Sequence, residues 1–277
     1  MISFEEALRT VLDSIKLLGV EDVKLENLSG YFLAEDLIAP FPSPQFDNSA
    51  VDGYGVKIKD LQGANEVALK SLRLVNSIAA GSDLPQQIQS GEAVKIFTGA
   101  RVPSSCEAVV MREFSTESNG HVSLGYEPTA GENIRRLGDE FGEGANVLSS
   151  RTKVSPPVVA LIASFGRTSI QVYRKPSVGL VVTGDELVEP GQQLKPGQIY
   201  NSNVYGLRAA VKELGITECK QYLSRDTLEE TKQKFQEALS ASDIVISSGG
   251  VSVGDHDYVK EALESLGVKT LFWRIAM

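Results

Sequence analysis

The sequence is poor in residues that bind soft metals or form cross-links. Its 277 residues include only two cysteines and two histidines. Cys106 and Cys219 lie far apart and form no CxxC motif, so we interpret them as free, inert thiols in a reducing compartment. Two histidines are too few for a histidine-rich zinc site, and we assign His256 no role.

Positive charge and long apolar runs are also scarce. The chain has 27 lysines and arginines against 36 aspartates and glutamates, a net charge of -9. Nucleic-acid binding needs a basic face, which this composition does not favour. No apolar run reaches the length of a membrane span, and glutamates occupy the N-terminal positions where a signal peptide needs positive charge. We therefore expect a soluble, cytoplasmic protein that binds neither nucleic acid nor membranes.

The C-terminal part of the chain alternates short apolar runs with helical patterns. A capping box formed by Asp226 and Glu229 opens one of these helices, and Gly215 ends the one before it. Strands that alternate with helices predict a doubly wound parallel sheet, because parallel strands need crossover connections. Strands are expected at 178–182, 217–223, 244–246 and 268–275, and helices at 203–214, 227–240 and 258–266.

Two polar, glycine-containing loops follow strands of this predicted sheet. Thr183, Gly184, Asp185 and Glu186 follow the first strand, and Ser247, Ser248, Gly249 and Gly250 follow the strand at 244–246. Ligands bind at the carboxyl ends of parallel strands, and glycine lets an anion approach the main chain. We expect the two loops to converge on one crevice. A plain strand-to-helix turn with Asp257 as N-cap is the alternative for the second loop.

The N-terminal part combines helical and β patterns. Ser3 and Glu6 form a capping box before an amphipathic run that ends at Gly19, and further helices are expected at 28–37 and 158–165. Prolines at 40, 42 and 44 mark a boundary. Short β-like runs at 56–58, 94–97, 108–111 and 121–124 follow. We predict a helical domain (1–44 and 129–173) with an inserted, mostly β subdomain (45–128), then an α/β domain (174–277).

Polar residues in this part have both structural and functional interpretations. Asp47 and Asp52 flank a turn, and Thr98 follows a strand, so each can serve a turn or contact a ligand. Arg135 and Arg136 are adjacent guanidinium groups of the kind that bind phosphate, or that form an ion pair within the domain.

Four segments together carry a family resemblance. They read PQFDNSAVDGYGVK, VKIFTGARVP, VTGDELVEPGQQLKPGQIYNSN and DIVISSGGVSVGDHDYVKE. In this order they resemble the molybdopterin molybdenumtransferase family, which comprises the bacterial MoeA proteins and the E domain of gephyrin. The resemblance implies a MogA-like α/β domain and insertion of molybdate into adenylylated molybdopterin, with Mg²⁺ as cofactor and AMP released. Lysine-rich and C-terminal segments of the family are not found here, so we expect a truncated chain with weak or no activity.

The resemblance also implies roles for individual residues. Asp52, Glu186 and Asp257 are expected to be catalytic and to hold Mg²⁺, together with an acidic group that strict alignment assigns to Glu140 rather than Asp139. Asp226 is either a ligand contact or a simple helix cap. The expected cofactor-binding residues are Thr98, Arg135, Arg136, Thr183, Gly184, Asp185, Asn201, Ser202, Asn203, Asp226, Ser247, Ser248, Gly249 and Gly250.

The same resemblance implies a homodimer with a shared crevice and an upstream molybdopterin adenylyltransferase. The apolar helices near 8–18 and 158–165 would supply contact surface. Two alternatives remain: a non-catalytic scaffold of the gephyrin E-domain type, and an adenylyltransferase-like enzyme. The FDNSAVDGYGV subdomain favours the transferase, because adenylyltransferases built on the same sheet domain lack it.

Overall fold

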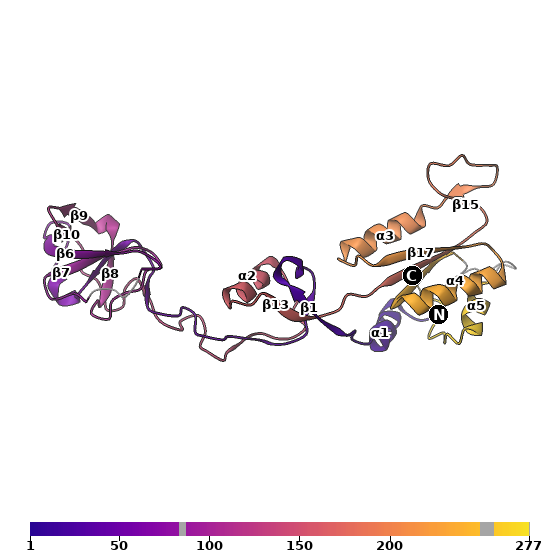
Figure 1. Ribbon diagram of the computed structural model, residues 1–277, viewed down its shortest axis with the longest axis horizontal. Coiled ribbons are helices and arrows are strands. Elements are labelled where there is room, and N and C mark those ends of the chain that lie inside the picture. Colours follow the sequence, from indigo (N-terminus) through magenta and orange to yellow (C-terminus); the bar gives the residue numbers. More distant parts are fainter. Residues whose placement is uncertain (83–86, 250–257, 277) are drawn as a thin grey trace. The chain divides into compact units, whose positions relative to one another are not determined.

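The computed structural model describes residues 1–82, 87–249 and 258–276 (Figure 1). Contacts divide the chain into two units. Unit 1 comprises Met1–Glu35 and Ser150–Met277, and unit 2 comprises Asp36–Ser149. The division into three segments at 44/45, 128/129 and 173/174 therefore remains a prediction. No described helix is long and apolar enough to cross a membrane.

Unit 2 is built on a six-stranded sheet in the order β8-β5-β7-β6-β10-β9. Its strands are β5 (Gly53–Val56), β6 (Lys70–Ile78), β7 (Glu92–Ile96), β8 (Ala108–Met111), β9 (Ser115–Ser118) and β10 (His121–Leu124). β8 and β10 have the predicted bounds, and β7 begins slightly earlier than expected. The run at 56–58 instead ends β5 and leads into a 3-10 helix, Ile58–Leu61.

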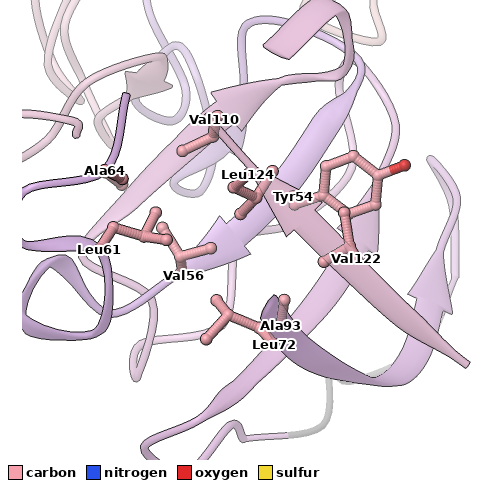
Figure 2. Close-up of a cluster of buried hydrophobic side chains, with 10 residues drawn as sticks. Tyr54, Val56, Leu61, Ala64, Leu72, Ala93, Val110, Val122 and Leu124 are labelled. Atoms are coloured by element: carbon pink, nitrogen blue, oxygen red, sulfur yellow. The ribbon is translucent and has the colours of Figure 1, made fainter. Parts of the chain in front are cut away.

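Side chains bury both faces of this sheet. In β8, Ala108 and Val110 belong to one apolar cluster while Val109 belongs to the other, as expected for alternating strand residues. Figure 2 shows the first cluster, in which Tyr54 and Leu124 are almost completely buried. The second cluster includes Cys106, and burial raises the pKa of its thiol to about 12. This thiol is therefore inert at neutral pH, as the sequence predicts.

Two short antiparallel pairs connect the segments that enter and leave unit 2. β3 (Leu37–Ile38) pairs with β12 (Asn146–Leu148), and β4 (Asn48–Ser49) pairs with β11 (Ile134–Arg135). The second pair carries Arg135 and places it opposite Asn48, shortly before Asp52. Pairing of chain segments that are distant in sequence thus positions the loop that contains the Asp52 carboxylate.

The first part of unit 1 mixes helices with a small sheet. α1 (Phe4–Ser14) and α2 (Pro156–Ser164) confirm two predicted helices, although α1 ends at Ser14 and not at Gly19, because Ile15 is extended. Ser3 caps α1 by accepting a hydrogen bond from the Glu6 amide. This part also contains a three-stranded antiparallel sheet in the order β1-β13-β2. Its strands are β1 (Val20–Lys24), β2 (Phe32–Leu33) and β13 (Ser169–Tyr173). The expected helical domain is therefore a mixed α and β structure.

The helix predicted at 28–37 is wrong. A 3-10 helix, Leu25–Asn27, precedes it, and Gly30 adopts a φ of +81° that a continuing α-helix does not allow. The amides of Gly30 and Leu33 donate instead to the carbonyls of Val154 and Thr152. Hydrogen bonds to a distant segment thus take the place of the helix expected here.

The second part of unit 1 is the predicted doubly wound domain. Its parallel sheet has the order β17-β14-β18, formed by Cys219–Ser224, Val178–Thr183 and Ile244–Ser248. α3 (Asn203–Glu213) lies on one face, and α4 (Leu228–Ala241) and α5 (Val259–Ser265) lie on the other (Figure 1). Leu180 packs with the α3 side and Val181 with the α4 side, because successive strand residues face opposite ways.

Two details of this domain differ from the prediction. Thr227 rather than Asp226 caps α4, since its hydroxyl accepts from the Glu230 amide. The expected strand at 268–275 does not form; one parallel bridge joins Ile275 to Ile2. Main-chain bonds of Arg274 and Ala276 to Ile2 draw the segment to the N-terminus, which leaves no edge strand there.

Candidate functional site

A pocket of about 160 Å³ lies at the carboxyl ends of β14 and β18. It is lined by Val182, Thr183, Glu186, Leu187, Ile199, Tyr200, Asn201, Ser202, Asn203, Ser248 and Gly249. The two polar loops predicted to converge therefore do meet, and the turn before α3 joins them. This is the edge of a parallel α/β sheet where ligands are expected.

Hydrogen bonds hold the walls of the pocket together. The Asn203 side-chain amide donates to the Ser248 hydroxyl at 2.9 Å, which connects the start of α3 to the end of β18. The Ser247 hydroxyl donates to the Gly249 carbonyl at 3.3 Å. A Cβ on Gly249 would lie 3.1 Å from both oxygens of Thr183, so only glycine lets the two loops approach this closely. Hydrogen bonds and close packing of the two loops therefore define the shape of the pocket.

Glu186 folds back over the preceding glycine. Gly184 has a φ of +145°, and a Cβ there would lie 2.7 Å from Glu186 Oε2. The Glu186 side chain stays exposed at the pocket wall. Nearby, the Asp185 amide donates to Asp226 Oδ2 at 3.3 Å, so Asp226 stabilises the loop that follows β14. The cap of α4 is Thr227.

The parallel bridge of β15 (Leu187–Val188) with β16 (Ile199–Tyr200) forms another part of the pocket wall. Leu187, Ile199 and Tyr200 line the pocket, but the sequence did not mark them as site residues. Their signal is only a pair of apolar residues on either side of a proline- and glycine-rich loop. Such a pattern is typical of any short strand pair.

In unit 2, Asp52 and Thr98 form a compact polar pair. Asp52 Oδ1 accepts from both the main-chain amide and the hydroxyl of Thr98, each at 2.8 Å. These bonds, with the charge of Arg112, lower the pKa of the exposed Asp52 carboxyl. The structure thus places two predicted site residues together and keeps the carboxylate ionised.

The arginine pair and the acidic pair of unit 2 have separate partners. Arg136 donates to Asp47 Oδ2 at 2.6 Å, which is the ion-pair alternative considered from the sequence. Arg135 is exposed in β11. Asp139 accepts from the Arg136 amide at 2.6 Å, and Glu140 accepts from the Ser43 hydroxyl at 2.6 Å. Asp139 thus closes a local turn, whereas Glu140 connects to the segment that enters unit 2.

The metal prediction rests on three carboxylates. Asp257 lies outside the described residues, as does Gly250 of the second loop. Within residues 1–82, 87–249 and 258–276, no three acidic, histidine or cysteine residues cluster as metal ligands. Asp52 and Glu186 are exposed carboxylates, and the lowered pKa of Asp52 favours its charged form. Such oxygen donors suit a hard cation such as Mg²⁺.

The fold and this pocket define a class of protein. Residues 179–277 match the family described as "Probable molybdopterin binding domain". Residues 2–166 match the family described as "MoeA N-terminal region (domain I and II)". The chain belongs to the MoeA family.

Individual relatives agree with this assignment. The molybdopterin molybdenumtransferase of Staphylococcus epidermidis is 35% identical over 99% of this chain, and that of Haemophilus influenzae is 35% identical over 100%. Two structures of the molybdopterin biosynthesis MoeA protein from Pyrococcus horikoshii superpose with TM-scores of 0.76 and 0.81, at 32% and 31% identity. They match 96% and 90% of this chain and 67% and 66% of their own. The chain spans 66% of the S. epidermidis protein and 68% of the H. influenzae protein.

Proposed function

We propose that this protein inserts molybdenum into adenylylated molybdopterin and releases AMP. The observation that carries the proposal is the pocket at the carboxyl ends of β14 and β18, with the Glu186 carboxylate in its wall. Membership of the MoeA family supports the assignment, as does the name of the curated relatives. The substrate is a pterin with a dithiolene and a pyrophosphate-linked AMP, and the second substrate is molybdate.

Main-chain donors in the pocket suit the phosphate part of such a substrate. Asn203 is the first residue of α3, where the amides of the first helical turn have no partners within the helix. Ser202 precedes it, and its amide donates to the Tyr200 carbonyl at 2.8 Å. Gly249 offers main-chain approach without a Cβ. The Asn203–Ser248 hydrogen bond holds these two elements together. We assign them to binding and orienting the substrate, with Thr183 and Ser247 as neighbouring contacts.

Carboxylates are assigned to holding Mg²⁺ and the reacting groups. Asp52, Glu186 and Asp257 would hold the ion; Glu140 is the further acidic group proposed for the site. When bound, Mg²⁺ supplies positive charge between these carboxylates and the substrate phosphates and polarises phosphoryl oxygen. Thr98 fixes and ionises Asp52, so that this carboxylate is ready to act as a ligand at neutral pH.

We further propose a homodimer in which Asp52 of one protomer acts on substrate held by its partner. α1 supports this assembly, because only Ala7 of its residues is buried while Phe4, Leu8 and Leu12 are 56%, 46% and 59% exposed. An apolar stripe of this kind is typical of an interface. An upstream molybdopterin adenylyltransferase would supply the adenylylated substrate.

Release of AMP tests this proposal. The protein is incubated with adenylylated molybdopterin, Mg²⁺ and molybdate, and AMP is quantified by chromatography alongside molybdenum bound to the pterin. We expect AMP and molybdenum-bearing pterin in equal amounts even where turnover is weak, and less AMP still when molybdate or Mg²⁺ is omitted. AMP release that is independent of molybdate would instead identify a hydrolase.

A further inference from the structure

The carboxylate of Glu189 accepts three hydrogen bonds, one of them from the pocket residue Asn201. Glu189 Oε2 accepts from the Tyr205 hydroxyl at 2.7 Å. Glu189 Oε1 accepts from the side-chain amides of Asn201 and Gln221, each at 3.3 Å. These bonds, led by that of Tyr205, lower the pKa of Glu189, so this side chain is ionised and accepts hydrogen bonds without donating any.

The polarity of this network fixes the orientation of two amides. An ionised carboxylate can only accept, so the nitrogen of the Asn201 carboxamide faces Glu189 and its oxygen lies on the other side. Gln221 is oriented in the same sense, because its oxygen accepts from Arg208 at 3.1 Å while its nitrogen donates to Glu189. If either amide were rotated by 180°, its oxygen would face the Glu189 carboxylate, and two acceptors would lie opposite each other.

The fixed orientation leaves one buried oxygen without a partner. Asn201 is 2% exposed, and its Oδ1 has no hydrogen-bond partner among the described residues. A buried carbonyl without a partner is costly, and such atoms are rare in folded proteins. Asn201 also lines the pocket, next to Ser202 and opposite Ser248. The residue that carries the orphaned acceptor therefore belongs to the wall of the proposed substrate site.

We propose that Asn201 is a specificity-determining residue whose Oδ1 accepts a hydrogen bond from the 2-amino group of the pterin, and that Glu189 is its positioning residue. This inference rests on the proposed function, because it concerns the same pocket. A pterin carries amino and ring N–H donors, which an oriented acceptor can recognise. A site built around a buried acceptor rejects an analogue that presents a carbonyl in place of the donor, since two acceptors would then face each other.

The discriminating experiment compares two ring ligands on four proteins. The ligands are a pterin and the matching lumazine, in which a carbonyl replaces the 2-amino group. The proteins are the wild type, Asn201→Leu and Glu189→Gln, with Glu229→Gln as a matched control in the exposed first turn of α4. Dissociation constants are measured by ligand-observed NMR, beside thermal melts and the affinity for adenylylated molybdopterin.

We expect the wild type and Glu229→Gln to prefer the pterin by roughly tenfold, the value of one hydrogen bond to a buried acceptor. Asn201→Leu removes the acceptor, so its preference should vanish. Glu189→Gln is close to isosteric and leaves the pocket wall in place. Its new amide can donate to Asn201 Oδ1 and turn that carboxamide round, so the preference should vanish here too.

The outcomes separate this inference from the function it rests on. A folded Asn201→Leu or Glu189→Gln variant that keeps the wild-type preference overturns the inference. So does a wild type that binds adenylylated molybdopterin and does not distinguish the two rings. If the wild type binds neither ring nor adenylylated molybdopterin, the proposed function fails first. Where Asn201→Leu does not fold, the milder Glu189→Gln variant decides.

Discussion

The Asp52 carboxylate of unit 2 accepts two hydrogen bonds of 2.8 Å from Thr98, both to the same oxygen. One donor is the main-chain amide and the other is the hydroxyl. Both stabilise the charged form of the carboxylate, and the pKa of Asp52 is lowered in consequence. Thr98 thus stabilises the charged form of Asp52 and also fixes the position of its carboxylate.

Substitution of Thr98 tests this relationship. Thr98→Val removes the hydroxyl and keeps the shape and the main-chain donor, so the pKa of Asp52 should rise part of the way toward its ordinary value of 3.8. The Thr98→Ser control retains the hydroxyl and should leave the pKa nearly unchanged. Carboxyl ¹³C NMR titration of Asp52 measures both. An unchanged pKa in Thr98→Val would show that the main-chain amide alone sets the charge.

A second carboxylate, that of Asp243, accepts hydrogen bonds from the short segment that connects β13 to β14. Arg174 donates to both of its oxygens at 2.8 Å, and Ser177 donates through its amide and its hydroxyl, also at 2.8 Å. These donors, led by the Arg174 guanidinium, hold the pKa of Asp243 far below its usual range. The stabilisation is therefore fully present above the unfolded-state pKa, about 3.9, and is lost as the pH falls toward the folded value.

We expect Asp243→Asn to destabilise unit 1 by about 1–2 kcal/mol at pH 7, the usual contribution of hydrogen bonds to a partly exposed charged group. The difference from the wild type should shrink progressively below pH 4, because the Asp243 carboxyl of the unfolded wild type then takes up a proton while that of the folded protein stays charged. Denaturant unfolding at pH 7 and pH 3 measures this. A difference of the same size at both values would contradict the charged-acceptor account.

Gly55 is tightly packed against a buried thiol. A Cβ at Gly55 would lie 2.8 Å from the sulfur of Cys106 and 3.0 Å from a methyl carbon of Val94. Gly55→Ala should therefore cost about 1–3 kcal/mol through overpacking. Cys106→Ala alone creates a small cavity, and the new methyl group partly fills that cavity in the double variant. The double variant should be more stable than the sum of the two single effects; strict additivity of the unfolding free energies would contradict this packing.

The apolar face of α1 is the surface that the dimer proposal needs. Leu8→Glu combined with Leu12→Glu places charge on an exposed stripe, so the fold of the monomer should survive while association weakens. Analytical ultracentrifugation should show a dimer for the wild type and a monomer for the variant, with matching circular dichroism. A wild-type monomer, or a dimer in the variant, would remove α1 from the proposed interface.

Local patterns predicted the parallel sheet but not every segment around it. β14 alternates residues between two helical layers, and its strong β-branched run identifies it without tertiary knowledge. The helix expected at 28–37 does not form, because Gly30 and the hydrogen bonds to 152–154 decide the structure of that segment. The segment at 268–275 was misassigned because its bonds go to Ile2 at the other end of the chain.

Some features of the candidate site could be predicted from the sequence, and others depend on the fold. Strand ends with glycine predicted the two loops of the pocket, since that chemistry is local. Nothing in the spacing of Glu189 and Asn201 indicates a hydrogen bond, because the two residues are twelve positions apart in the sequence. Tyr205 and Gln221 join this network only in the folded structure. Likewise, sequence order did not show that Arg136 is engaged by Asp47 rather than left for a phosphate.

The most direct test of the account is AMP release by Glu186→Gln. This substitution keeps the size of the side chain and removes its charge, in an exposed residue whose loss should leave the thermal melt unchanged. The account predicts that molybdate-dependent AMP release falls by about a hundredfold or more, whereas the Glu229→Gln control keeps wild-type activity. Wild-type AMP release by folded Glu186→Gln would show that the pocket carboxylate does not take part in molybdenum insertion.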